Sequence, residues 1–152
     1  MYKENIANKN TTVLAYLGDS VYELYVRKHV LETGQVNADR LHRSAVRFVK
    51  AEAQANVIKS MLEDLTEEEL SLVKRARNKK TSTKPKNADP IDYKWATAFE
   101  ALLGFLYLSE NHSRIEEIIS QAIHQTENNR SIKNFSNCNQ EVSNEQSGSN
   151  LR

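Results

Sequence analysis

The stretch ATAFEALLGFLYL, residues 96–108, decides the fold of this chain. Glu100 is the only charged residue among these 13 positions, and the stretch is the most apolar part of the sequence. It predicts a helix over about residues 91–109 that other parts of the chain cover on most sides. Such a core requires further elements that carry apolar faces.

Helical spacing of apolar residues predicts four such elements. Together with the central one, the predicted helices cover about residues 11–33, 37–62, 67–78, 91–109 and 111–126. Thr11 or Thr12 can cap the first helix, and Gly34 suits the position just after its end. Thr66, followed three residues later by Glu69, is a capping-box pattern at the start of the third helix.

Two segments lack the helical pattern. Residues 79–90, KKTSTKPKNADP, hold both prolines and no large apolar side chain, so they are predicted to form a loop. Residues 127–152 hold seven asparagines, five serines and only five apolar residues, which predicts a disordered polar tail. No strand pair is evident. We therefore expect an all-α fold, with one domain of about five main helices over residues 1–126 and a tail over 127–152.

Length and composition exclude several classes of protein. The chain has 152 residues, 39% apolar and 27% charged, which suits one soluble domain. No apolar run reaches the roughly 18 residues of a membrane span, and the N-terminus lacks the apolar centre of a signal peptide. Cys138 is the single cysteine, which excludes an internal disulfide and a cysteine-based zinc site. We expect a cytoplasmic protein with no membrane partner.

Asp19, within VLAYLGDSVYEL, and Glu100 are carboxylates in helices that otherwise look like core. An ionised carboxylate taken from water needs a partner. If the two helices cross at these points, one Mg²⁺ or Mn²⁺ between the acids serves both, because these cations prefer oxygen ligands. The alternative interpretation is that each acid pairs with a Lys or Arg. Gly18 and Gly104 indicate close approach of backbone or ligand near both acids.

LAYLGDSVYEL, residues 14–24, resembles the signature of the ribonuclease III nuclease domain. TAFEALLGFLYL, residues 97–108, is similar to the second motif of that family. Order, spacing and helical surroundings agree over about residues 10–125. The resemblance is closest to the short form, Mini-ribonuclease III, which lacks the double-stranded-RNA-binding domain, and RARNKKTSTKPKNAD, residues 75–89, is similar to the basic loop of that form.

The resemblance implies an endoribonuclease, a phosphodiester hydrolase that uses Mg²⁺ to cleave double-stranded RNA and matures precursor 23S ribosomal RNA. Asp19 and Glu100 match two metal-binding catalytic acids of the family. Ala15 and Thr97 stand where the full-length family has two more acids, so water and RNA phosphate oxygens would complete the coordination. The resemblance also implies a two-fold homodimer, and it leaves open whether a ribosomal protein helps the enzyme.

The charge is polarised locally although the net charge is only +1. Seven basic residues and no acidic one occur between Lys74 and Lys86. Such a segment suits an RNA phosphate backbone, from which it releases counterions, and a solvated charged face is the alternative. The candidate RNA-binding residues are Arg43, Lys74, Arg75, Arg77, Lys79, Lys80, Lys84, Lys86 and Asn87.

Two other function classes stay open at this point. Ala15 and Thr97 also suit a non-catalytic double-stranded-RNA-binding or ribosome-assembly module that kept the fold. A plain helical dimerisation domain would carry ion-paired acids and bind no RNA. Glu23 lies four residues after Asp19 and is expected to pair with Arg27 rather than to join the site.

Overall fold

A computed structural model describes residues 5–80 and 86–146 of the chain. Within these residues the chain forms six α-helices, two short 3-10 helices and no strand, which confirms the all-α expectation. The elements are η1 (Ile6–Asn8), α1 (Thr11–Leu31), α2 (Ala38–Val49), α3 (Ala51–Ser60), η2 (Leu62–Asp64), α4 (Glu67–Asn78), α5 (Pro90–Leu108) and α6 (His112–Gln146). No helix in the described part has the length and apolar character to span a membrane.

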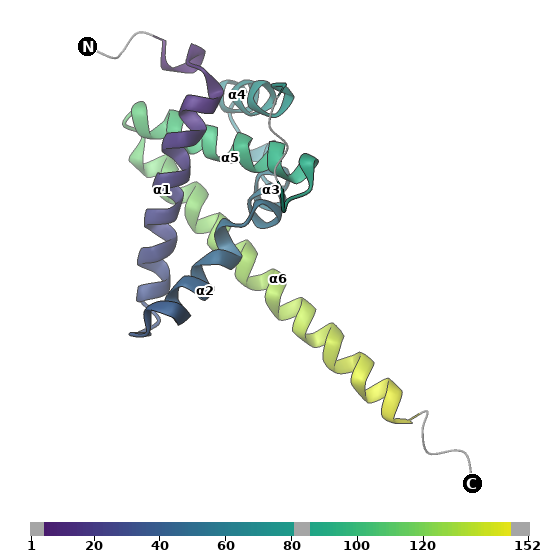
Figure 1. The fold of residues 1–152 in the computed structure, drawn as a ribbon. Helices are drawn as coiled ribbons and strands as arrows, with labels where there is room; N and C mark the ends of the chain where they lie inside the picture. Colours follow the sequence, from purple (N-terminus) through teal and green to yellow (C-terminus); the bar gives the residue numbers. More distant parts are fainter. Residues whose placement is uncertain (1–4, 81–85, 147–152) are drawn as a thin grey trace.

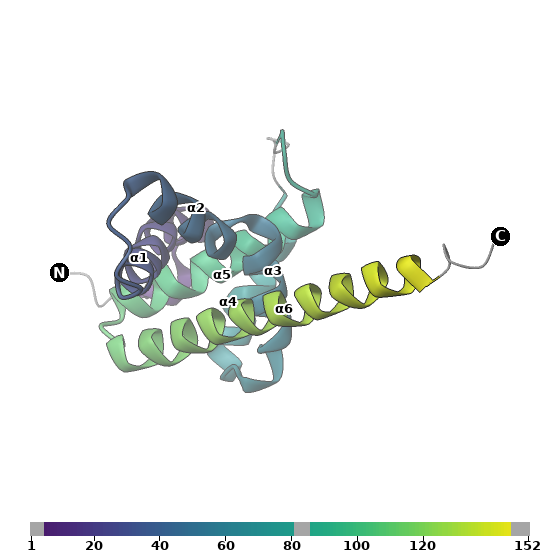
Figure 2. The same cartoon turned by 90° about the horizontal axis from the view of Figure 1, so that it is seen from below.

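Helix α5 lies at the centre of the fold, as its apolar sequence predicts (Figure 1). Nine of its residues are buried, and helices α1, α3 and α4 all pack against it. Tyr22 of α1 and Phe99 of α5 meet edge to face with ring centroids 5.0 Å apart. Figure 2 shows α6 passing along one side of this group, where Ile115 and Ile118 enter the core. The core is therefore one cluster built around α5.

Polar side chains cap the starts of α1, α2, α4 and α5, and one of these caps differs from the prediction. Asn10, one residue earlier than expected, caps α1, because its side-chain oxygen accepts a hydrogen bond from the backbone N–H of Thr12 at 3.0 Å. Thr66 and Glu69 form the predicted capping box of α4. Gly34 follows α1 with φ +77°, a conformation that side chains with a Cβ rarely adopt. Local sequence signals thus set most of the helix boundaries.

The segment predicted as one helix over residues 37–62 forms two helices. Helix α2 ends at Val49, and Lys50 is extended, with φ −63° and ψ 148°, before α3 begins. Helix α2 packs mainly on α1, whereas α3 packs on α5, so the chain must change direction between them. The Gln54 side chain donates from Nε2 to the carbonyl oxygen of Val49 at 2.8 Å. A carbonyl released by the break is thereby satisfied inside the fold.

The last helix is longer than the sequence indicates. Helix α6 continues to Gln146, whereas a disordered tail was predicted from residue 127 onward. Its first turns are anchored in the core, and extending a helix that has already formed costs much less than starting one. Side chains as far as Ile132 also line a groove beside α3. Residues 147–152 of the predicted tail lie outside the described residues.

Candidate active site

Helices α1 and α5 cross at two glycines, and this crossing brings Asp19 and Glu100 together. A Cβ on Gly18 would lie 1.7 Å from the carbonyl oxygen of Glu100. A Cβ on Gly104 would lie 2.0 Å from the carbonyl oxygen of Leu14. Neither separation leaves room for a side chain, so only glycine allows the two backbones to touch. Asp19 directly follows Gly18 in α1, so it lies beside the helix that carries Glu100.

The pKa of Glu100 responds to the charge of Asp19, which shows that the two carboxyl groups are near each other. Glu100 is mostly buried, and burial followed by the charge of Asp19 raises its pKa to about 8, while a hydrogen bond with the Gln54 side chain opposes the rise. The surrounding protein and the charge of Glu23 raise the pKa of Asp19 as well, although the Asp19 side chain is exposed to solvent. Asp19 loses its proton first, so its charge acts on Glu100. Two acids that repel each other favour a proton or a cation between them.

Neither acid is neutralised by a basic side chain within the described part of the chain. The ion pairs found there involve other acids. Glu23 pairs with Arg27, whose Nε lies 3.0 Å from the Glu23 carboxylate, as the sequence predicts. Ion pairing of Asp19 and Glu100 with Lys or Arg, the alternative considered for the sequence, therefore finds no support in the structure.

The donor atoms fit a hard divalent cation with few protein ligands. Asp19 and Glu100 offer carboxylate oxygens, which Mg²⁺ and Mn²⁺ prefer. The Oε1 atom of Gln54 is buried and has no hydrogen-bond partner within the described ranges, so it can accept from water bound to such a cation. Among the residues that the structure describes, no group of three or more His, Cys, Asp or Glu side chains could hold a metal. Water and substrate oxygens would supply the other ligands.

The two departures from the ribonuclease III pattern provide no further ligand. Ala15 is buried one helical turn before Asp19. Thr97 donates its hydroxyl hydrogen to the carbonyl oxygen of Tyr93 at 2.9 Å, so this group is engaged inside α5. The site consequently has two carboxylates, one from each crossing helix.

Three of the predicted RNA-binding cations also hold the fold together. Arg75 donates to backbone carbonyl oxygens of the N-terminal segment. Lys79 donates from Nζ to the Thr12 hydroxyl at 2.8 Å. The Arg77 guanidinium lies 4.6 Å from the ring centroid of Trp95. These contacts tie α4 to the start of α1 and to α5, so replacing any of the three cations would disturb the fold as well as any RNA contact.

The other predicted RNA-binding residues differ in their surroundings. The exposed ones are Arg43, Lys74, Lys80, Lys86 and Asn87. Lys84 lies outside the described residues. These exposed side chains lie on α2, on α4 and on either side of residues 81–85.

Gln54 is the site residue that sequence reasoning missed. Only 1% of its surface is exposed, and its side chain contacts both the α2–α3 break and Glu100. The one signal in the sequence is an amide among Ala53, Ala55 and Val57, all of which are buried. A single buried amide does not reveal its partner, so the pattern alone could not join Gln54 to Glu100.

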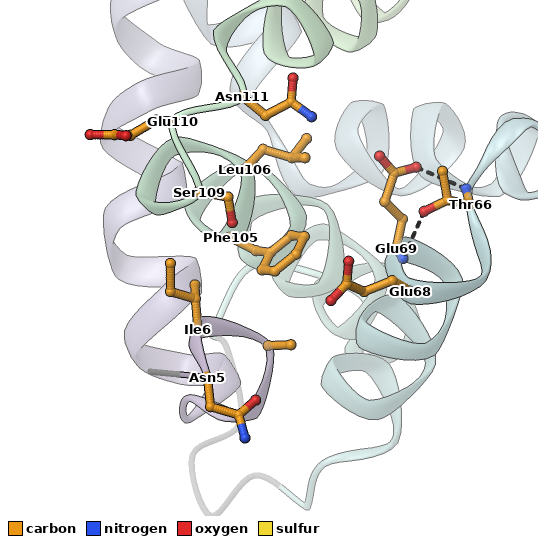
Figure 3. Close-up of a pocket in the computed structure, with 11 residues that line it drawn as sticks. Asn5, Ile6, Thr66, Glu68, Glu69, Phe105, Leu106, Ser109, Glu110 and Asn111 are labelled. Carbon is orange, nitrogen blue, oxygen red and sulfur yellow. Dashed lines mark hydrogen bonds between the residues drawn. The ribbon is translucent and has the colours of Figure 1, made fainter. Parts of the chain in front are cut away.

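A hollow of about 620 Å³ lies away from the two acids, between η1, the start of α4 and the end of α5 (Figure 3). Figure 3 shows Glu69 joined to Thr66 at its edge. Arg114 also donates to the Glu69 carboxylate from Nε and Nη2, at 2.9 Å each. The buried acid of this hollow is thus neutralised by a bidentate ion pair, which is typical of a structural contact.

Comparisons with known proteins show which proteins this chain resembles. Residues 12–111 match the family model of the ribonuclease III domain. The chain is 53% identical to Mini-ribonuclease 3 of Brevibacillus brevis over 113 residues, which are 74% of this chain and 84% of that protein. It is 42% identical to Mini-ribonuclease 3 of Streptococcus pneumoniae over 120 residues, 78% of this chain and 94% of that protein.

A solved structure extends the likeness to the fold. The crystal structure of a protein from Fusobacterium nucleatum has a TM-score of 0.73 and 35% sequence identity to this chain. The match covers 81% of this chain and 98% of that one. Asp19 and Glu100 both lie inside the region that the family model matches.

Proposed function

This chain belongs to the ribonuclease III family and is an endoribonuclease of the ribonuclease III type, and we propose that it cleaves double-stranded RNA at a divalent cation held by Asp19 and Glu100. The observation that carries the proposal is the glycine crossing of α1 and α5. It sets two acids side by side, and no basic partner neutralises them among the described residues.

Each side chain of the site has a distinct part in the proposed reaction. When bound, Mg²⁺ supplies an acidified water molecule and neutralises the charge that develops on the phosphate. Asp19 and Glu100 hold the cation from two helices. Glu100 must release its proton to do so, because its pKa without a cation is about 8. Gln54 keeps the Glu100 carboxylate oriented from α3.

The proposed substrate is double-stranded RNA, and more narrowly precursor 23S ribosomal RNA. Duplex RNA is recognised mainly through shape, phosphates and 2′-hydroxyl groups, and the exposed cations Lys80 and Lys86 suit such contacts. Support for the narrower substrate comes from the resemblance to Mini-ribonuclease III. The single cysteine, Cys138, fits the reducing cytoplasm, where we place the reaction.

We further propose that two copies of the chain form a two-fold dimer through α1. An apolar stripe runs along the outer side of this helix: Val13, Tyr16, Leu24 and Leu31 are 58%, 83%, 67% and 58% exposed. At about 100° per residue, Asp19 lies between this stripe and the face that packs on α5. A second copy covering the stripe would place Asp19 at the rim of the interface, where both sites can face one RNA duplex.

The test of the proposed function is cleavage of a generic RNA duplex with and without Mg²⁺. Asp19→Asn and Glu100→Gln should each lower the cleavage rate by roughly 100-fold or more, because one of two cation ligands is lost. Glu23→Gln is the matched control, since this nearby acid already pairs with Arg27. Circular dichroism checks that every variant is folded. Wild-type rates in folded Asp19→Asn or Glu100→Gln protein would refute the assignment.

A further inference from the structure

A second candidate site lies outside the catalytic pair, in a groove between the α2–α3 junction and α6. The groove has a volume of about 530 Å³. Figures 1 and 2 show α6 passing close to α3 in this part of the molecule. Its polar lining consists of Arg47, Lys50, Glu52, Asn56, Thr126, Asn129 and Arg130. Three cations therefore share one groove with a single lining carboxylate.

The Arg47 guanidinium lacks a hydrogen-bond acceptor for one of its buried N–H groups among the described residues. Its guanidinium carbon lies over the Phe48 ring, 4.8 Å from the ring centroid. Its Nε atom is buried and has no hydrogen-bond partner among the residues that the structure describes. Burial, followed by the nearby positive charge of Arg130, lowers the pKa of Arg47, while Glu127 acts in the opposite direction. A buried unpaired donor beside a like charge is unfavourable unless an anion joins them.

The acids near the groove are already engaged. Glu127 lies 2.7 Å from Nε2 of His29. Glu52 lies 3.8 Å from Nζ of Lys50, a long contact between two exposed groups. Neither carboxylate forms an ion pair with Arg47 or Arg130 within the described residues. The two arginines thus remain available for an anion that enters the groove.

We propose that this groove binds a phosphate group of the RNA strand through Arg47 and Arg130, as a backbone contact separate from the cation site. The inference rests on the proposed function. Guanidinium forks match phosphate oxygens in geometry and charge. Ala53 lines the groove, and the next residue, Gln54, contacts Glu100. The groove and Glu100 are thus contacted by neighbouring residues in the first turn of α3.

The first arm of the test measures duplex RNA binding against salt concentration, without Mg²⁺ so that no cleavage occurs. Arg130→Gln and the double variant Arg47→Gln/Arg130→Gln should lower the slope of log affinity against log salt by about one. Arg130 is exposed, so its single variant leaves the fold intact even if the change at Arg47 perturbs packing on Phe48. Lys28→Gln is the matched control, an exposed cation outside the groove that should leave the slope unchanged.

The second arm separates an RNA phosphate from free phosphate. Inorganic phosphate is compared with chloride at equal ionic strength, and the thermal midpoint of wild type is compared with that of the double variant. A lower slope in Arg130→Gln supports the RNA contact whether or not inorganic phosphate shifts the midpoint. A slope equal to that of wild type overturns it, even if phosphate stabilises wild type alone. Wild-type protein that binds no duplex RNA would refute the proposed function. The thermal midpoints would then still show whether the groove binds free phosphate.

Discussion

At the scale of single residues, Glu100 is the group whose chemistry depends most on its surroundings. Burial and the charge of Asp19 raise its pKa to about 8. Gln54 contacts the same carboxyl group from α3. The fold thus tolerates a protonated Glu100, and a divalent cation must displace that proton in order to bind. Cation binding and proton release are therefore coupled, so cation affinity should rise with pH up to about 8.

Glu100→Gln should raise the free energy of unfolding at pH 8.5 in the absence of metal, by on the order of 1–3 kcal/mol. The folded protein binds the Glu100 proton more tightly than the unfolded chain, where the pKa is near 4.5, so wild-type stability falls as pH rises from there through about 8. Glutamine has no such proton and should not show this decline. Urea unfolding at pH 5 and pH 8.5 measures the difference. An equal pH dependence in both proteins would contradict the assignment of the buried acid.

Asp19→Asn should lower the pKa of Glu100, because it removes the nearby negative charge while keeping the shape of the side chain. An NMR titration of the glutamate carboxyl carbons measures this pKa in both proteins. Glu23→Gln serves as the control, since Glu23 acts on Asp19 rather than on Glu100. If the Glu100 titration is the same in wild type and Asp19→Asn, the two carboxylates are not neighbours in solution.

Both acids stand out in the sequence because Asp19 directly follows Gly18 and Glu100 is the only charged residue in the apolar run that contains Gly104. Gln54 does not, since an amide in an alanine-rich helix carries no comparable cost and its partner lies 46 positions away in the chain. The basic residues were predicted only as a group. Which of them face solvent and which bind the N-terminal segment depends on how α4 packs, and that information is not local.

At the scale of elements, the crossing of α1 and α5 positions the site. Gly18 and Gly104 let the backbones touch, and each glycine meets a carbonyl group of the opposite helix. Helix–helix distance therefore sets the separation of the two acids. Any side chain added at the crossing would push the helices apart and weaken the core at the same time.

Gly104→Ala should destabilise the protein by about 3 kcal/mol or more, because its Cβ would lie 2.0 Å from a backbone oxygen that cannot move alone. Gly34→Ala is the matched control. Its Cβ would meet nothing within 4 Å, and the cost comes from φ +77° alone, about 1–2 kcal/mol. Urea unfolding compares both variants with wild type. A smaller loss at Gly104 than at Gly34 would show that the crossing is looser than described.

The sequence predicted most helices but not where the chain bends between them. The alanine-rich run around Lys50 keeps a helical period, so nothing local marks the change of direction between α2 and α3. That bend follows from packing on two different partners. The polar stretch after Glu127 has too little apolar surface to predict a helix, yet its first residues lie against α3 and continue a helix that is already formed.

At the scale of the whole molecule, the apolar stripe on α1 is the feature that a single copy does not explain. Tyr16 and Leu24 are 83% and 67% exposed, whereas Leu14, Gly18 and Tyr22 on the other side of the helix are buried. Covering the stripe with a second copy would remove this surface from water. It would also let the two cation sites of the dimer face one RNA duplex. The proposed dimer therefore links the surface of α1 to the position of Asp19.

Leu24→Glu should convert the protein to a monomer, because a charge in the middle of the stripe cannot be buried without a partner. Val36→Glu is the matched control, since Val36 is 93% exposed but lies beyond the end of α1. Sedimentation velocity over a range of protein concentrations measures the state of both variants and of wild type. A wild-type monomer at every concentration would contradict the dimer, and so would a dimer that survives Leu24→Glu unchanged.

The most direct test is to measure Mn²⁺ binding to the protein without RNA at pH 8.5, with electron paramagnetic resonance as the readout. Wild type should bind about one Mn²⁺ per chain, since the site has two carboxylates at one helix crossing. Asp19→Asn and Glu100→Gln should each weaken that binding at least roughly tenfold, and Glu23→Gln should not. Equal Mn²⁺ affinity in wild type, Asp19→Asn and Glu100→Gln would contradict the claim that these two acids hold the catalytic cation.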